Sequence, residues 1–513
     1  MNLVKSAMTV GGMTLVSRVL GFMRDILIAG ALGTGPMADA FFVAFKFPNL
    51  FRRLFAEGAF NSAFVPLFAK ALEGDGKTAA RRFAEEALSV LLFTLIAFTA
   101  IAELAMPWAM YLIAPGFADT PDKFEMGVLF TRIAFPYLMF MSMVALLSAV
   151  LNSLGRFSAA AAAPVLLNLV LIAALWFVAP HTDNPGLVLS WGVAIAGAAQ
   201  FVMLLIAVKR ADISLRLRLP RLTPGVRRLI KLGIPGVIAG GITQFNLLVG
   251  SIIASLQDGA VSLLYYADRI YQLPLGVVGI AIGIVLLPDL SRRLRAGDET
   301  GADNAQNRAF EFSMFLTVPA SVALAVIPVP IIQVLFERGA FSSDDTYGAA
   351  MALAAFAIGL PAFVLTKVFS PGFFAREDTM TPMRFAAIGI AVNILGSLVL
   401  FFWMGHVGIA LATSAAAWVN ASLLGATLMK RGFYVPDARL KSRLPRLALA
   451  CLIMGAGLWA GAAGAAPYLA ASFIEGVLAL LVLVVSGAVL FGGAALVTGA
   501  THMNDLKRAF RRA

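Results

Sequence analysis

Several charged side chains stand inside segments that are otherwise apolar enough to cross a membrane. The stretch PNLFRRLFAEGAFNSAF, residues 48–64, places Arg52, Arg53 and Glu57 where a membrane helix normally carries leucine. A charged residue near the centre of such a helix costs about 2.5–3.5 kcal/mol on insertion scales. Charges at these depths therefore indicate a binding or transport function.

The embedded charges fall in three predicted helices, 7–32, 37–70 and 260–291. These three helices contain six cationic and four anionic side chains. An excess of two positive charges in hydrocarbon requires an anionic ligand or water, which predicts an anion site in a wet cavity. Arginine favours phosphate, because its planar fork donates two parallel hydrogen bonds. The cations are Arg18, Arg24, Lys46, Arg52, Arg53 and Arg269, and the anions are Asp25, Asp39, Glu57 and Asp268.

Spacing along each helix predicts which charges can pair. Residues four or seven apart lie on nearly the same face, whereas adjacent residues do not face each other. This predicts the pairs Arg53–Glu57 and Asp39–Lys46, and it predicts that Arg24 does not pair with its neighbour Asp25. The cations without a predicted partner are Arg18, Arg24, Arg52 and Arg269. The structural alternative is pairing across helices, Arg24 with Asp39 or Arg269 with Asp25.

The composition is that of a membrane protein with many spans. Of the 513 residues, 60% are hydrophobic and 13% are charged, against about 25% charged residues in soluble proteins. The single cysteine, Cys451, excludes a disulfide within the chain. Windows of about 20 apolar residues predict an all-α fold of fourteen transmembrane helices: 7–32, 37–70, 82–113, 124–153, 158–179, 185–208, 227–255, 260–291, 305–336, 345–372, 380–404, 407–429, 444–466 and 471–499.

The distribution of basic residues predicts the orientation. Of the forty lysines and arginines, thirty fall in loops and tails on the side of the N-terminus, eight within helices, and two, Lys123 and Arg338, in loops on the other side. Positive loops face the cytoplasm, so both termini are expected inside the cell. Orientation and contact with anionic lipid account for the net charge of +12 without nucleic acid.

A weak internal repeat predicts two related lobes. Pro66 and Pro288 lie 222 residues apart, as do Gly186 and Gly408. Six helices per unit keep both units in one orientation, which gives a parallel repeat of the kind that alternating-access carriers use. We expect an N-terminal lobe at 1–208, a basic cytoplasmic linker at 209–226, a C-terminal lobe at 227–430, and two further helices with a tail at 431–513.

The sequence contains no arrangement of residues typical of a metal site or a nucleotide-hydrolysing site. The histidines His181, His406 and His502 are far apart in the predicted topology, and no cluster has the spacing of metal ligands. No Walker motif is present, so ATP hydrolysis by this chain is not expected. We predict no metal, no cofactor and no enzymatic activity.

Three stretches resemble the MurJ (MviN) family of lipid II flippases, in the multidrug/oligosaccharidyl-lipid/polysaccharide exporter superfamily. They are SRVLGFMRD (17–25), ADAFFVAFKFPNLFRRLFAEGAFNSAFVP (38–66) and YYADRIYQLPLG (265–276). The resemblance implies two six-helix lobes around a V-shaped cavity, and two final helices forming a groove for a lipid tail. It implies transport of lipid II, the undecaprenyl-diphosphate-linked peptidoglycan precursor, to the outer leaflet of the bacterial inner membrane.

The resemblance also implies roles for residues. Arg18, Arg24, Arg52 and Arg269 would bind the substrate, and Asp25, Asp39, Arg53 and Glu57 would form charge pairs at the gates. Some family members carry a sodium site with an acid on helix 7. Because no acid lies near Gln244 and Asn246, we expect no such site. We expect a monomer in contact with membrane lipids, without nucleic acid, whose transport depends on the membrane potential.

The sequence is also compatible with other functions. The chain could export another polyprenyl-diphosphate-linked saccharide, which the charge pattern does not distinguish from lipid II. Export of cationic drugs would favour an acidic cavity instead. A membrane phosphatase or glycosyltransferase would need a general base, for which Asp25, Asp39, Glu57 and Asp268 are the buried candidates, and would cleave lipid II unaided. A scaffold for wall synthesis would tolerate loss of the arginines.

Overall fold

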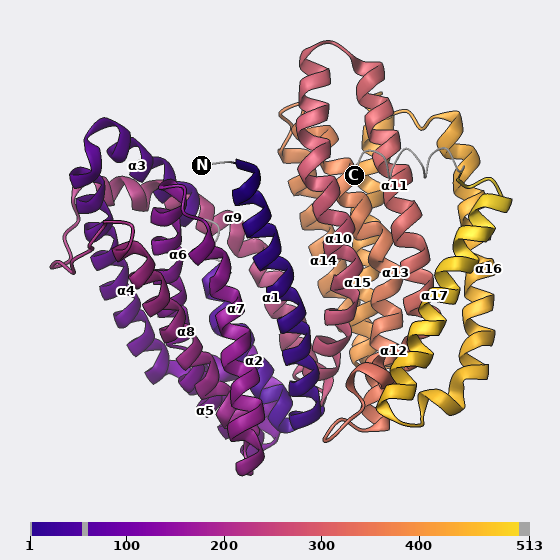
Figure 1. The fold of residues 1–513 in the computed structure, drawn as a ribbon, viewed down its shortest axis with the longest axis horizontal. Coiled ribbons are helices and arrows are strands. Elements are labelled where there is room, and N and C mark those ends of the chain that lie inside the picture. Colours follow the sequence, from indigo (N-terminus) through magenta and orange to yellow (C-terminus); the bar gives the residue numbers. More distant parts are fainter. Residues whose placement is uncertain (1–2, 54–59, 502–513) are drawn as a thin grey trace. The chain divides into compact units, whose positions relative to one another are not determined.

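The computed structural model describes residues 3–53 and 60–501, and these fold into helices without a β-strand. The chain divides into two compact units (Figure 1). Unit 1 comprises Met1–Ser262 and Gly339–Phe341, and unit 2 comprises Leu263–Arg338 and Ser342–Ala513. The all-α fold predicted from the sequence is confirmed, whereas the predicted lobe boundaries at 208 and 227 stay a prediction.

Unit 1 is a helix bundle in which α1 packs on α7, α2 on α5, and α8 on α6 and α7. Its core contains stacked aromatic rings, including those of Phe64, Phe68 and Phe83. Its helices are α1 (Leu3–Leu32), α2 (Pro36–Arg52), α3 (Asn61–Gly74), α4 (Gly76–Ile113), η2 (Pro115–Asp119), α5 (Pro121–Ala134), α6 (Tyr137–Ser153), α7 (Ser158–Ala173), the π-turn η3 (Ala174–Val178), η4 (Ala179–His181), α8 (Pro185–Lys209) and α9 (Pro224–Ala254).

Unit 2 is built around α13, which packs on α11, α12 and α15. Small residues permit this close packing. A Cβ atom on Gly359 of α13 would lie 2.6 Å from the Ser414 hydroxyl of α15. The hairpin of α16 and α17 packs on α11 and α12. The helices are α10 (Ala260–Arg295, whose first turn lies in unit 1), α11 (Glu299–Val326), α12 (Pro328–Phe336), α13 (Ser343–Phe374), α14 (Met380–Met404), α15 (His406–Lys430), α16 (Ala438–Leu469) and α17 (Phe473–Val497).

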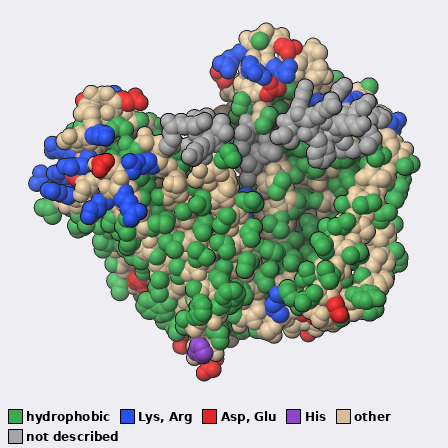
Figure 2. Space-filling view, viewed as in Figure 1, with side chains coloured by type: hydrophobic (Ala, Val, Ile, Leu, Met, Phe, Trp, Pro, Cys, Tyr) green, Lys and Arg blue, Asp and Glu red, His purple; other side chains and the backbone are tan. Residues whose placement is uncertain are grey.

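The helices make this a multi-pass membrane protein. Among the described residues, ten spans are long and apolar enough to cross a bilayer, and the predicted total of fourteen stays a prediction. Apolar side chains cover much of the face drawn in Figure 2. Exposed aromatic side chains gather near helix ends, as they do at membrane interfaces; they include Trp108, Tyr111, Trp403, Tyr468 and Phe473.

Three predicted spans each correspond to two helices. The predicted span 37–70 covers α2 and α3, 124–153 covers α5 and α6, and 305–336 covers α11 and α12. Pro136 and Pro328 stand at two of these breaks, where a residue without an N–H group cannot continue the helical hydrogen bonds. Residues 54–59, with Glu57 among them, lie outside the described residues.

The turn between α1 and α2 depends on a glycine. Gly33 has a φ of +62°, and a Cβ atom there would lie 2.3 Å from the carbonyl oxygen of Ala340. The Ala340 N–H donates to the Gly30 oxygen at 2.8 Å, so the segment Gly339–Phe341 is held against the end of α1 within unit 1.

We predict that Gly33→Ala destabilises the protein. Left-handed backbone costs an L-residue roughly 1–2 kcal/mol, and the Ala340 carbonyl must also move. Gly35→Ala is the matched control, because Gly35 has an extended φ of −164° and open space around it. Thermal unfolding in detergent should show a lower midpoint for Gly33→Ala alone. Equal midpoints for the two variants would contradict this interpretation of the turn.

Candidate functional site

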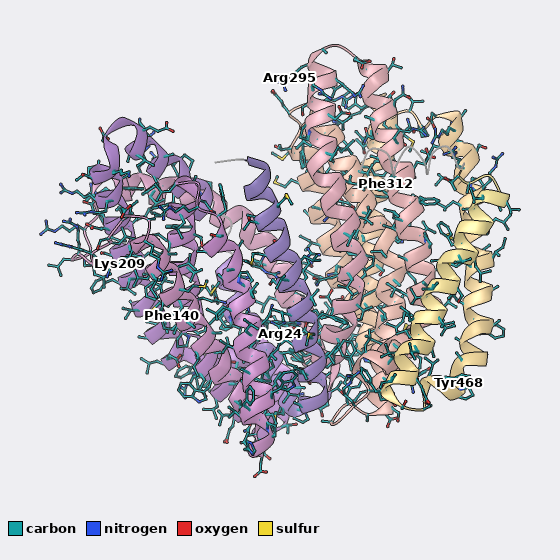
Figure 3. The ribbon with its side chains drawn as sticks, viewed as in Figure 1. Arg24, Phe140, Lys209, Arg295, Phe312 and Tyr468 are labelled. Atoms are coloured by element: carbon teal, nitrogen blue, oxygen red, sulfur yellow. The ribbon has the colours of Figure 1, made fainter. Side chains whose placement is uncertain are left out.

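Arg24 of unit 1 carries a buried guanidinium. It lies on α1 and is 3% exposed (Figure 3). Its Nε and Nη2 donate to Oδ1 of Asp25 at 3.0 and 2.7 Å, and Nη1 donates to Oδ1 of Asn168 on α7 at 2.9 Å. The guanidinium carbon also lies 5.6 Å from the ring centre of Phe45 on α2. Three helices therefore fix the position of this cation.

The prediction that Arg24 does not pair with Asp25 is wrong. Adjacent Cα–Cβ bonds diverge by about 100° around a helix, but an arginine side chain is long enough to fold back over its neighbour. Both residues are buried, so neutralising each other relieves the cost of two buried charges. Spacing rules derived for exposed helix surfaces do not describe this case.

Asn168 positions Arg24, a role that the charge pattern did not identify. Its Nδ2 donates to the Ser17 carbonyl oxygen of α1 at 2.9 Å, while its Oδ1 accepts from Arg24. Gly21 of α1 lies beside this amide, where a Cβ atom would be in ordinary van der Waals contact with Nδ2 at 3.5 Å. The available signal was a lone amide inside an otherwise apolar helix, because a buried amide needs hydrogen-bond partners.

Arg52 lies at the end of α2 and is half-buried. Its Nε donates to Oδ1 of Asn49 at 3.0 Å, and Nδ2 of Asn49 donates to the Phe45 carbonyl oxygen at 2.7 Å. The neighbouring Arg53 is exposed. An aromatic cluster holds this end of α2 against α4 and the α5–α6 break; its rings are Phe47, Phe51, Phe98 and Phe135. The predicted pair of Arg53 with Glu57 involves a residue outside the described part of the chain.

Asp39 of α2 pairs with Lys123 instead of Lys46, the partner predicted from helix spacing, or Arg24, the partner in the structural alternative. The Lys123 ammonium lies 2.8 Å from Oδ2 of Asp39 and 2.8 Å from Oδ1 of Asp258. Lys123 was predicted in an outer loop, but it lies in α5 and is 1% exposed. The predicted span began one residue too late to include it. A buried carboxylate needs a close cation, and the packing of α2 on α5 supplies this one.

Asp39 also holds the start of α10. Besides Lys123, it accepts hydrogen bonds from the backbone N–H groups of Gly259 and Ser262 and from the Ser262 hydroxyl, each at 2.9 Å. The first N–H groups of a helix have no partner within the helix, and a carboxylate satisfies them favourably. Asp39 thus acts as an N-terminal cap supplied by a distant helix. We call Asp39, Lys123, Gly259 and Ser262 the Asp39 latch.

Arg18 and Arg269, the two remaining arginines predicted to bind the substrate, are not fully buried. Arg18 is on the exposed face of α1. In unit 2, Arg269 of α10 is half-buried, with its guanidinium carbon 5.3 Å from the ring centre of Tyr265. Lys367 of α13 is close to α10, since a Cβ atom on Gly279 would lie 2.7 Å from its ammonium. The described residues hold no group of three metal-binding side chains.

This arrangement can bind anions but offers little for bond cleavage. Of the embedded acids that could serve as a general base, Asp25 and Asp39 are engaged by buried cations. Lys123 also changes the charge balance derived from the sequence, because it neutralises Asp39 from outside the three helices counted there. Asp39 is therefore compensated by a cation of α5 and Arg24 by its own neighbour Asp25.

Comparison with solved structures finds proteins of similar fold. The chain is similar to a structure described as lipid II flippase MurJ in an inward closed conformation, with a TM-score of 0.75, 23% identity, and coverage of 94% of this chain and 97% of that one. It is also similar to an inward-facing multidrug resistance MATE family transporter of the MOP superfamily. There the TM-score is 0.65 and the identity 13%, over 83% of this chain and 98% of that one.

Comparison of sequences identifies the family. The chain is 55% identical over 463 residues to a probable lipid II flippase MurJ of Rhizobium meliloti (strain 1021), covering 90% of this chain and 86% of the relative. It is 37% identical over 442 residues to the lipid II flippase MurJ of Burkholderia cenocepacia, covering 85% and 86%. The family model described as lipid II flippase MurJ matches residues 28–479. With a match of this extent, the chain belongs to the MurJ family.

Proposed function

We propose that this protein flips lipid II from the cytoplasmic to the periplasmic leaflet of the bacterial inner membrane. The observation that carries the proposal is the 55% identity, over 90% of the chain, to a probable lipid II flippase. The multi-pass helical fold and its buried guanidinium suit movement of an anionic lipid headgroup across the bilayer. The protein acts as a transporter and leaves the covalent bonds of its substrate intact.

Arginines bind the diphosphate of lipid II in this proposal. Arg24 and Arg52 of unit 1 and Arg269 of unit 2 form charge-assisted hydrogen bonds to its oxygens, and Arg18 assists. Asp25 and Asn168 hold the Arg24 fork in place before the substrate arrives. This preorganisation reduces the entropy lost when the substrate binds. Asp25 also neutralises Arg24 in the empty protein.

Alternating access moves the bound headgroup. Both termini and the basic linker face the cytoplasm, and the Asp39 latch lies on the periplasmic side. The latch holds the first turn of α10 to unit 1 in the present structure. Its release and reformation accompany each transport cycle, while the monomer remains surrounded by membrane lipids.

We predict that Arg24→Ala lowers the rate of lipid II flipping about 10-fold or more, because a hydrogen bond between charged groups contributes roughly 1.5–3 kcal/mol. Arg24→Lys should be intermediate, since it keeps the charge but loses the planar fork. The assay places purified protein in vesicles with labelled lipid II and measures the fraction that reaches the opposite leaflet, using a lipid II-degrading enzyme that cannot cross the bilayer.

The matched control is Arg295→Ala, which removes an exposed arginine at the end of α10. It should flip lipid II at the wild-type rate. Wild-type rates for Arg24→Ala at equal reconstitution would contradict the role of Arg24. A wild-type protein that moves no lipid II but moves another polyprenyl-diphosphate-linked saccharide would contradict the proposed substrate.

We predict that Lys123→Met destabilises the protein and slows flipping. Removing the ammonium leaves the buried Asp39 carboxylate uncompensated, at a cost of about 3–5 kcal/mol. Asp258→Asn is the control, because Asp258 is 76% exposed and an exposed ion pair contributes only about 0–1 kcal/mol. Thermal unfolding should separate the two variants, and Asp39→Asn combined with Lys123→Met should recover part of the loss. Identical unfolding curves for Lys123→Met and Asp258→Asn would exclude this role of the latch.

We predict that the membrane potential drives flipping. The cell interior is negative, so each net negative charge that moves outward gains about 2.3 kcal/mol per 100 mV. In vesicles that hold a potassium gradient, valinomycin can impose a potential or collapse it, and the initial rate of flipping should follow. A rate that is the same at every imposed potential would show that the cycle carries no net charge.

A further inference from the structure

The segment between α8 and α9 lies extended along α4 and displays leucines on its outer side. We call residues 213–222 the linker segment. Leu217, Leu219 and Leu222 are 64%, 76% and 56% exposed. They alternate with Arg216, Arg218 and Arg221. A surface strip in which exposed leucines alternate with arginines is unusual for a segment that faces only water.

Side chains of α4 hold the linker segment in place. The Arg216 N–H donates to Oε1 of Glu85 at 3.2 Å, and the Arg218 N–H donates to the Ser89 hydroxyl at 2.9 Å. Nε of Arg218 donates to Oε2 of Glu85 at 2.6 Å. Glu85 and Ser89 are fully buried. The exposed leucines are therefore displayed by a fixed backbone.

The alternation of the segment explains why its outer residues are apolar. Successive side chains of an extended chain point to opposite sides, so residues 213, 215, 217 and 219 share one side. Ile213 is buried in the core of unit 1, and Leu215 packs against that core. Leu217 and Leu219 continue this side beyond the edge of the core, where protein no longer covers them.

The attachment points lie where α4 enters the apolar part of the membrane. Glu85 and Glu86 form the last charged turn of α4 before an uncharged run that reaches Glu103. Phe93 is the first large apolar side chain of α4 that is exposed, about 6 Å beyond Ser89 along the helix. The linker segment is thus fastened beside the start of the apolar run of α4.

Positive charge surrounds this strip. Residues 209–231 contain eight lysines and arginines and one acid, Asp212. Blue side chains gather at the end of unit 1 that carries this segment (Figure 2), and Lys209 is labelled beside it in Figure 3. The side chains of Arg216 and Arg221 are exposed. Anionic headgroups of the inner leaflet complement such a surface.

We propose that the linker segment is an anionic phospholipid-binding surface. Leu217 and Leu219 insert at the boundary of the acyl chains, and Arg216 and Arg221 bind the phosphates of phosphatidylglycerol or a similar lipid. The amphipathic strip anchors the connection between α8 and α9 to the inner leaflet. This surface is separate from the proposed lipid II site and does not depend on flipping activity.

The test measures the depth of single labelled positions. Cys451 is the only cysteine and is buried, so Cys451→Ala provides a background for Leu219→Cys labelled with bimane. The full chain is reconstituted in phosphatidylcholine vesicles with or without phosphatidylglycerol. Doxyl lipids labelled near the headgroup should quench Leu219→Cys. Ser214→Cys is the control, because Ser214 is exposed on the other side of the segment and should be quenched less.

A second measurement tests the charge. With the doxyl group carried on either phosphatidylglycerol or phosphatidylcholine, quenching should favour the anionic lipid. Arg216→Gln and Arg221→Gln should each reduce that preference about fivefold, whereas Arg295→Gln should leave it unchanged. Equal quenching of Leu219→Cys and Ser214→Cys would overturn the proposal. The same holds if quenching is equal with both lipids and is unchanged by Arg216→Gln and Arg221→Gln. Binding of the segment to a soluble protein that shields Leu219→Cys from lipid would also overturn it.

Discussion

The cost of burying charge in a membrane protein constrains this structure more than any other interaction. Two buried cations, Arg24 and Lys123, are each held beside a buried carboxylate by helices that meet at that point. Either charge alone would be expensive in an apolar surrounding, and pairing lowers that cost only when the geometry also satisfies the remaining donors and acceptors. Asn168 does this for Arg24, and the first turn of α10 does it for Asp39. These polar contacts therefore fix which helices lie together, while the apolar surfaces fill the volume around them.

The sequence predicted the fold class and the helices that carry Arg24 and Asp39, but not the partners of these charges. Apolar windows located the helices because burial in lipid and burial in protein both select apolar residues. Breaks inside three spans were missed, although Pro136 and Pro328 mark two of them. The pairing of Arg24 with Asp25 could not follow from helix spacing, because it depends on how a long side chain bends in a confined space. Lys123 was missed because a lysine next to a helix end looks like a loop residue until the packing of α2 on α5 is known.

The same physical rule operates at the end of unit 1 that carries the linker segment. Glu85 is buried and accepts from the Arg216 N–H and the Arg218 guanidinium, while Ser89 accepts from the Arg218 N–H. An extended segment without a neighbouring strand must satisfy its backbone groups in some other way, and α4 provides side chains for this purpose. Successive side chains of an extended segment point to opposite faces, so Leu217 and Leu219 share one face and Arg216 and Arg218 the other. A regular pattern of leucine and arginine in the sequence thereby becomes a two-sided surface.

Pairing of Arg24 with Asp25 also bears on how a carrier can be emptied. A guanidinium that binds a diphosphate tightly must let it go on the other side of the membrane, and an unpaired buried cation would oppose release. A carboxylate within hydrogen-bonding distance offers the cation a second partner at 2.7 Å, so under the proposed function the loaded and empty proteins would differ in which anion Arg24 binds. Asn168 holds the guanidinium in place in this structure, so under the proposed function the exchange would need little movement of α1. Asp25, which helix spacing did not pair with Arg24, would under the proposed function allow a strong phosphate-binding cation to work in repeated cycles.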